Sequence, residues 1–134
     1  MKILSIAVAL LLPLCVFAQR PNSPEEQEKQ LREAIDKEVD RYIEMLDLED
    51  WQAFYVDSIL TYNYGQRMAE INKLAEAKVS NMDLVYQVSD KWVEATYVAF
   101  QGVFDEDQWA KYLKQGGAKE KKLRDKRAAK LNQK

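Results

Sequence analysis

The chain has 134 residues, a length typical of one domain, and a formal net charge of −2 at pH 7. It has no histidine and a single cysteine, so it lacks the commonest general base and the usual zinc and copper ligands, and we expect no cofactor and no metal site. The charge is unevenly distributed along the chain. Residues 118–134 carry eight basic side chains against two acidic ones, whereas residues 19–117 carry a net charge of −9.

The first 18 residues have the pattern of a secretory signal peptide. A positively charged start is followed by an apolar run over residues 3–12 and by a cleavage site of small or branched residues that ends at Ala18. The apolar run is shorter than the ~20 residues of a transmembrane helix. A lipoprotein signal would need a small residue before Cys15, where the chain has Leu14. We predict cleavage after Ala18 and a periplasmic or secreted protein without cysteine.

The segment that begins at Ser23 predicts a first helix. Ser23 suits the N-cap, Pro24 suits the first helical position, and the glutamates that follow suit the first turn. Its apolar residues form one stripe at helical spacing, made of Leu31, Ile35, Tyr42 and Met45 with Ala34, Val39 and Leu46 beside it. We expect this helix to end near Asp47 and to form an antiparallel hairpin with the next one.

The stretch from Leu48 to Val79 predicts the longest helix, around which the rest of the chain is organised. Its main apolar stripe consists of Ala53, Val56, Leu60, Tyr64, Met68, Ile71 and Leu74 with Ala75. A second stripe lies on nearly the opposite side, only in the N-terminal half, and consists of Trp51, Tyr55, Ile59 and Tyr62. The first half therefore needs apolar partners on two sides. At Gly65 two interpretations stay open: another helix packs close, or the helix bends.

A third helix is expected from Met82 to Val103, after a break where Ser80 or Asn81 can serve as N-cap. Its main stripe is Val85, Val88, Trp92, Ala95 with Thr96, Ala99 and Val103, and Tyr86, Val93, Tyr97 and Phe100 widen one flank.

Asp105 and Gln108 have the spacing of a capping box and predict a short fourth helix. This helix carries Trp109, Tyr112 and Leu113, and we expect Gly116-Gly117 to end it. The basic tail over residues 118–134 fits either a solvated helix or a disordered segment. No segment long enough for a β-strand shows alternating apolar and polar residues, so the predicted fold class is all-α. We expect an elongated antiparallel bundle of three long helices with a short fourth helix, in one domain over residues 19–117.

The residue patterns favour binding over catalysis. The acids of Asp105–Asp107 lack the glycine and distal glutamate of an EF-hand, and helix capping accounts for them. A phosphate-binding glycine loop and a nucleophile elbow are both missing, so we expect no enzyme. Ten residues are Trp or Tyr, which suit a half-exposed binding surface, although the core of a thin bundle is the alternative. We expect the tail to be solvated, with weak contact to an anionic membrane as the alternative, and no nucleic-acid partner.

Two segments of the chain resemble each other. Leu48–Gln52 and Phe104–Gln108 both read as apolar, polar, two variable residues and glutamine, and each opens a helix. This pairing resembles the LTxxQ motifs of the Spy/CpxP family of small periplasmic proteins, with Glu49 and Asp105 in place of threonine. The resemblance implies a cradle-shaped, often dimeric helical protein. Family members act as ATP-independent chaperones for unfolded envelope proteins or restrain a stress-sensing kinase, and the lack of histidine here argues against the zinc binding of a further branch.

Two hypotheses of function follow. The first is an exported, non-enzymatic, chaperone-like or envelope-stress protein that holds partly unfolded clients. The second is a structural or signalling module that acts through a homodimer or partner-helix interface. In both, the predicted contact residues are Trp51, Tyr55, Ile59, Tyr62, Tyr86, Val93 and Tyr97. The motif residues Leu48, Gln52, Phe104, Asp105 and Gln108 are predicted to be structural.

Overall fold

The computed structural model describes residues 23–133, and every regular element in that range is a helix. The elements are α1 (Pro24–Leu46), α2 (Asp50–Glu76), α3 (Met82–Gln101), α4 (Glu106–Tyr112), a π-helical segment (Leu113–Gly117) and α5 (Ala118–Leu131). The predicted all-α class, with three long helices and a short fourth, is confirmed. The predicted signal peptide lies outside the described residues.

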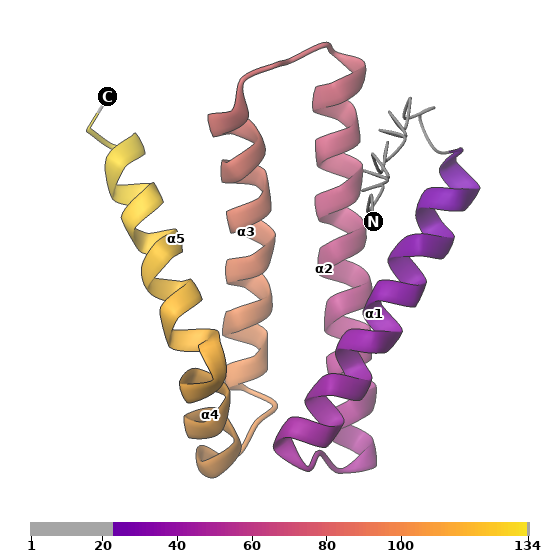
Figure 1. The fold of residues 1–134 in the computed structure, drawn as a ribbon, viewed down its shortest axis with the longest axis vertical. Helices are drawn as coiled ribbons and strands as arrows, with labels where there is room; N and C mark the ends of the chain where they lie inside the picture. Colours follow the sequence, from indigo (N-terminus) through magenta and orange to yellow (C-terminus); the bar gives the residue numbers. More distant parts are fainter. Residues whose placement is uncertain (1–22, 134) are drawn as a thin grey trace, which may run out of the picture.

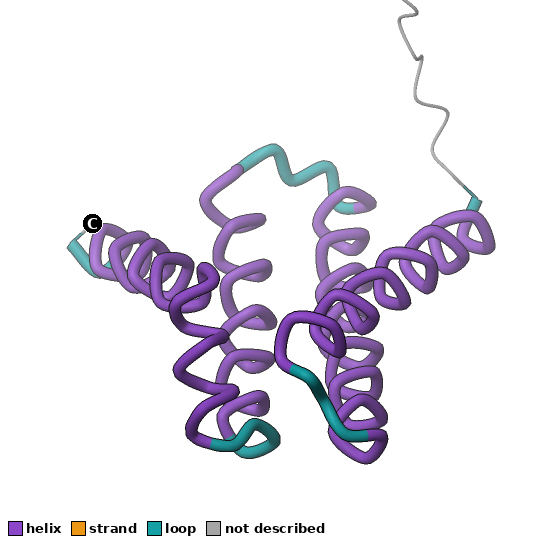
Figure 2. The backbone as a smooth tube through the Cα atoms, turned by 60° about the horizontal axis from the view of Figure 1, so that its bottom comes forward, coloured by secondary structure: helices purple, strands orange, loops and turns teal. Residues whose placement is uncertain are grey.

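The four longer helices lie side by side in the order α1, α2, α3, α5 (Figure 1). The antiparallel pair α2 and α3 forms the centre, and α1 and α5 form the two edges. α1 and α5 diverge from the central pair toward the top of Figure 1, and Figure 2 shows the same divergence from another side. At the other end, α4 and the C-terminal part of α1 close the bundle.

Side chains cap three helices where the sequence predicts it. The N–H of Glu26 donates to Ser23 Oγ at 3.2 Å, and the N–H of Asp83 donates to Asn81 Oδ1 at 2.9 Å. The N–H of Gln108 donates to Asp105 Oδ1 at 2.8 Å. These bonds satisfy backbone groups that have no partner within the helix.

Two helices end earlier than predicted. α2 ends at Glu76 rather than Val79, because Lys78 adopts a left-handed conformation with φ of 55° that reverses the chain. α3 ends at Gln101, and the N–H of Gly102 donates to the carbonyl of Ala99 in a tightened last turn.

The core lies at the closed end of the bundle. Its buried apolar side chains come from α1, α2, α3 and the loops that precede α2 and α4: Ile35, Tyr42, Leu46, Leu48, Val56, Leu60, Phe100 and Phe104. The ring of Tyr42 meets that of Phe100 edge-on, with centroids 5.2 Å apart. In α3 the buried residues are Thr96 and Phe100, both in its C-terminal half, so its N-terminal half contributes little to the core.

The helical conformation is interrupted at Gly116, within the Gly116-Gly117 pair that was predicted to end the fourth helix. Gly116 adopts a φ of 129°, which produces a kink, and the chain continues directly into α5. At Gly117 a Cβ atom would stand 2.7 Å from Cε1 of Tyr112, so this position has no room for a side chain. The glycines therefore redirect the chain, and most of the basic tail is a helix.

Gly65 does not mark a close helix contact, because a Cβ atom there would meet no atom within 4 Å. α2 is a continuous helix through this position. The glycine borders an open groove between α1 and α2, which is described below.

Candidate functional site

The two similar motifs meet in space and pin the start of α2 to the start of α4. Nε2 of Gln52 donates to Oε1 of Gln108 at 2.6 Å, and Nε2 of Gln108 donates back to Oε1 of Gln52 at 3.0 Å. The same amides donate to the carbonyls of Val103 (3.1 Å) and Leu46 (3.4 Å). Gln52 is only 3% exposed, and buried polar groups need such partners. We call this pair the glutamine clasp.

Each glutamine of the clasp also caps its own helix. Oε1 of Gln52 accepts from the N–H of Glu49 at 3.0 Å, and Oε1 of Gln108 accepts from the N–H of Asp105 at 2.9 Å. Leu48 and Phe104, which open the two motifs, are both buried. The predicted structural role of the motif residues therefore has a physical basis.

The loop between α1 and α2 supplies a capping residue to each of the two helices. Asp47 is the left-handed C-cap of α1, with φ of 52°, and Glu49 holds the N-cap position of α2. Oε2 of Glu49 also accepts a hydrogen bond from the indole N–H of Trp51 at 2.6 Å. This contact orients the first aromatic ring of the helix.

Three of the four second-stripe residues of α2 lie open to solvent. Trp51 and Tyr55 are each 52% exposed, and Tyr62 is 63% exposed. Ile59 differs, since it is partly buried and packs against the core. Phe54 is not part of the predicted stripe, but it is 68% exposed and its ring centroid lies 5.8 Å from that of Tyr55. Its spacing of three residues from Trp51 could have indicated it. We call Trp51, Phe54, Tyr55 and Tyr62 the aromatic face.

The aromatic face is open because the neighbours of α2 cover other sides of this helix. α1 covers the side that carries Thr61 and Asn72, which bond Arg32 and Gln27 of α1. α3 covers the side that carries Asn63, whose amide donates to the buried Thr96 hydroxyl at 3.0 Å. Side chains four and seven residues apart share one side of a helix, and this places Trp51, Tyr55 and Tyr62 together. Tyr62 lies at the border with α3, where its ring meets that of Trp92 edge-on with centroids 6.1 Å apart.

The remaining predicted contact residues do not join the aromatic face. Tyr86 is 50% exposed and lies under the guanidinium of Arg127, whereas Val93 is partly buried. Tyr97 is partly buried, with its ring centroid 5.0 Å from that of Trp109. These residues share a side of α3 that is turned away from α2, and α5 folds back along this side, with Arg124 over Tyr97 and Arg127 over Tyr86.

α5 is attached to α3 by charged contacts. Arg127 makes two hydrogen bonds of 2.7 Å to the carboxylate of Asp90. Nε of Arg124 donates to Glu94 at 3.1 Å, and its guanidinium lies 5.4 Å from the ring centroid of Tyr97. Arg124 is only 6% exposed, so this arginine is part of the interior. A bidentate arginine pair is a geometrically specific contact.

The shifted tyrosine pKa values belong to the core. Burial raises the pKa of Tyr112 to about 12, and burial likewise raises the pKa of Tyr42 and of Tyr64. These hydroxyls are therefore neutral at physiological pH. Within residues 23–133, no group of three histidine, cysteine, aspartate or glutamate side chains is arranged to hold a metal ion.

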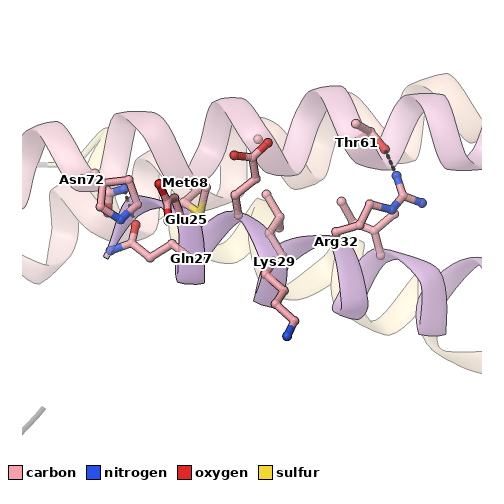
Figure 3. A pocket seen from close by; sticks show the side chains of 12 residues that line it. Glu25, Gln27, Lys29, Arg32, Thr61, Met68 and Asn72 are labelled. Atoms are coloured by element: carbon pink, nitrogen blue, oxygen red, sulfur yellow. Dashed lines mark hydrogen bonds between the residues drawn. The ribbon is translucent and has the colours of Figure 1, made fainter. Parts of the chain in front are cut away.

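A groove of about 720 Å³ separates the N-terminal half of α1 from α2 (Figure 3). Leu31, Ile35 and Met68 supply its apolar lining, and Gly65 leaves space on α2. Hydrogen bonds cross between the helices from Arg32 to Thr61 (3.1 Å) and to Asp57, and from the Asn72 amide to Gln27 (2.9 Å). Figure 3 shows where Arg32, Thr61, Asn72 and Gln27 lie. The groove follows from the divergence of α1.

None of the described helices is both long and apolar enough to cross a membrane. Comparisons of the chain with protein-family models, with curated proteins and with solved structures give no match.

Proposed function

We propose that this protein is an exported, non-enzymatic holding protein that binds partly unfolded polypeptides on its aromatic face without using a nucleotide. The observation that carries the proposal is the solvent exposure of four aromatic side chains on one half of α2. Adjacent exposed apolar side chains mark interaction sites on folded proteins. Trp and Tyr contribute both apolar area and a hydrogen-bonding edge, which suits varied partners.

The aromatic face stands on a rigid support. The glutamine clasp fixes the first turn of α2, and the contact with Glu49 orients Trp51. A helix that is already ordered loses little conformational entropy when a client binds. The face therefore suits binding in which the client, and not the protein, changes conformation.

The expected affinity is low, which favours reversible holding over a permanent dimer. An aromatic side chain buries roughly 150–250 Å², so four rings that are half to two-thirds exposed offer about 500 Å². A stable interface needs about 800 Å² from each partner. Burial of this area offsets only part of the several kcal/mol that association costs. Clients would thus be released without ATP.

Aggregation of an unfolded test protein, followed by light scattering, tests the proposal. We expect suppression at near-stoichiometric ratio, and its loss in the variant W51Q/Y55Q/Y62Q. A matched control changes three exposed apolar residues elsewhere, M82Q/L84Q/L123Q, and should keep the activity. No suppression at tenfold excess of the unmodified protein would reject the proposal.

Sedimentation equilibrium separates this function from the homodimer alternative. A holding protein sediments as a monomer with the aromatic face free. A tight dimer that W51Q/Y55Q/Y62Q dissociates would instead assign the face to self-association.

A further inference from the structure

We propose that the outward side of α5 is a docking surface for anionic phospholipid bilayers. Four lysines carry it: Lys119, Lys122, Lys126 and Lys130. They follow one another at intervals of three, four and four residues, which places them on one side of a helix. All four are exposed, and they span about 16 Å of helix at 1.5 Å per residue. We call them the lysine row. This proposal does not depend on the holding function.

The lysines of the lysine row form no ion pair with other described residues of the protein. The helix carries seven basic residues against two acidic ones. Among residues 23–133, the basic side chains of α5 that form ion pairs are Lys121, Arg124 and Arg127, and no ion pair involves the lysine row. The contacts with α3 therefore neutralise one side of the helix and leave the positive charge of the other side facing solvent.

The two edges of the molecule have opposite charge. α1 carries eight acidic residues against four basic ones, and its exposed acids include Glu26, Glu33, Asp40 and Glu44. α1 and α5 lie on opposite edges of the helix layer (Figure 1). An anionic plane attracts the α5 edge and repels the α1 edge, so the charge distribution selects one orientation. Attraction acts within a Debye length, about 8 Å at physiological ionic strength, so contact requires the α5 edge itself.

The chemistry of α5 favours a lipid surface over nucleic acid. α5 contains no aromatic residue on which bases could stack. Its arginines, which suit bidentate phosphate recognition, are occupied by Asp90 and Glu94. Lysines in a straight row suit the diffuse charge of a headgroup layer. Leu123, 46% exposed beside the row, supplies an apolar side chain that can enter the boundary between headgroups and acyl chains.

Co-sedimentation with vesicles tests the proposal on the protein recovered after export. Vesicles of phosphatidylglycerol and phosphatidylcholine in equal parts should bind the protein at low salt, and vesicles of phosphatidylcholine alone should not. The variant K119Q/K122Q/K126Q/K130Q should lose roughly fivefold in partitioning for each lysine removed. Lys→Arg changes at the same four positions should keep binding, because the charge is retained.

A control variant that loses the same number of lysines elsewhere shows whether binding depends on where the charge lies or only on the net charge. K29Q/K37Q/K73Q/K78Q removes four exposed lysines, two in α1, one in the last turn of α2 and one just after it. This variant should bind anionic vesicles like the unmodified protein. Helicity by circular dichroism confirms the fold of each variant. Equal binding by the lysine-row variant, equal loss in the control, or no binding to anionic vesicles would overturn the proposal. Binding of single-stranded DNA that depends on the row, without vesicle binding, would also overturn it and assign the row to nucleic acid.

Discussion

Two groups of aromatic residues in this protein have similar composition and opposite surroundings. Tyr42, Phe100, Phe104 and Tyr112 pack together where α1, α3 and α4 meet, and Phe100 is fully buried. The aromatic face, at the start of α2, is more than half exposed. Both groups follow helical spacing, so spacing alone does not decide burial. What decides it is whether another helix packs on that side.

The first prediction compares how much stability is lost when one phenylalanine of each group is changed to alanine. Phe100→Ala should lower the free energy of unfolding by about 3 to 5 kcal/mol, because it leaves a cavity in the core. Phe54→Ala, in the aromatic face, should change it by no more than about 0.5 kcal/mol. Urea denaturation followed by circular dichroism measures both. A large cost at Phe54 would mean that this ring is covered in solution.

The second prediction concerns the glutamine clasp, which connects the two regions. Gln52→Leu should cost about 1 to 3 kcal/mol of unfolding free energy, since it removes both hydrogen bonds to the Gln108 amide and the one to the Val103 carbonyl, in a buried place. The double variant Q52L/Q108L should cost less than the sum of the single variants. Strict additivity in this double-mutant cycle would show that the two amides do not interact.

The third prediction concerns how stability depends on pH through the buried tyrosines Tyr42 and Tyr112. An unfolded tyrosine has a pKa of about 10, whereas burial raises the pKa of Tyr112 to about 12 and also raises that of Tyr42. The fold favours the neutral hydroxyls, so their contribution to stability is complete below pH 10 and is lost as pH rises toward 12. Thermal unfolding at a series of pH values should show this loss. Y42F/Y112F should reduce it, and an identical pH profile in that variant would contradict the assignment.

The smallest expected effect is at Gly65, in α2. Gly65→Ala should stabilise the protein by about 0.5 to 1 kcal/mol, because the new methyl group meets no atom and alanine is the better helix former. Urea denaturation measures it. A loss of stability would show that α1 lies closer to α2 in solution and closes the groove.

The sequence was sufficient for the fold class, the order of the helices and most caps. Ser23, Asn81 and Asp105 have side chains that can cap only locally, so their roles follow from neighbouring residues. The stripe of α2 that includes Val56 and Leu60 was also predictable, and both residues are fully buried.

The remaining features depend on contacts between distant segments. That Gln52 and Gln108 would bond each other does not follow from either motif alone, and the burial of Asn63 depends on Thr96. The glycines at 116 and 117 indicated an interruption, but glycine permits a kink as readily as an end, so the sequence left open whether the tail is a helix. α5 packs over Tyr86 and Tyr97, and this contact also could not be read from the sequence.

The central claim is that the aromatic face is free in the isolated protein and covered by a client. A variant W92F/W109F leaves Trp51 as the only tryptophan, so acrylamide quenching of its fluorescence reports this position directly. We predict strong quenching in the folded monomer, close to that in urea, and reduced quenching when an unfolded test protein is added. Weak quenching in the free monomer, or no change on addition of the client, would contradict the account.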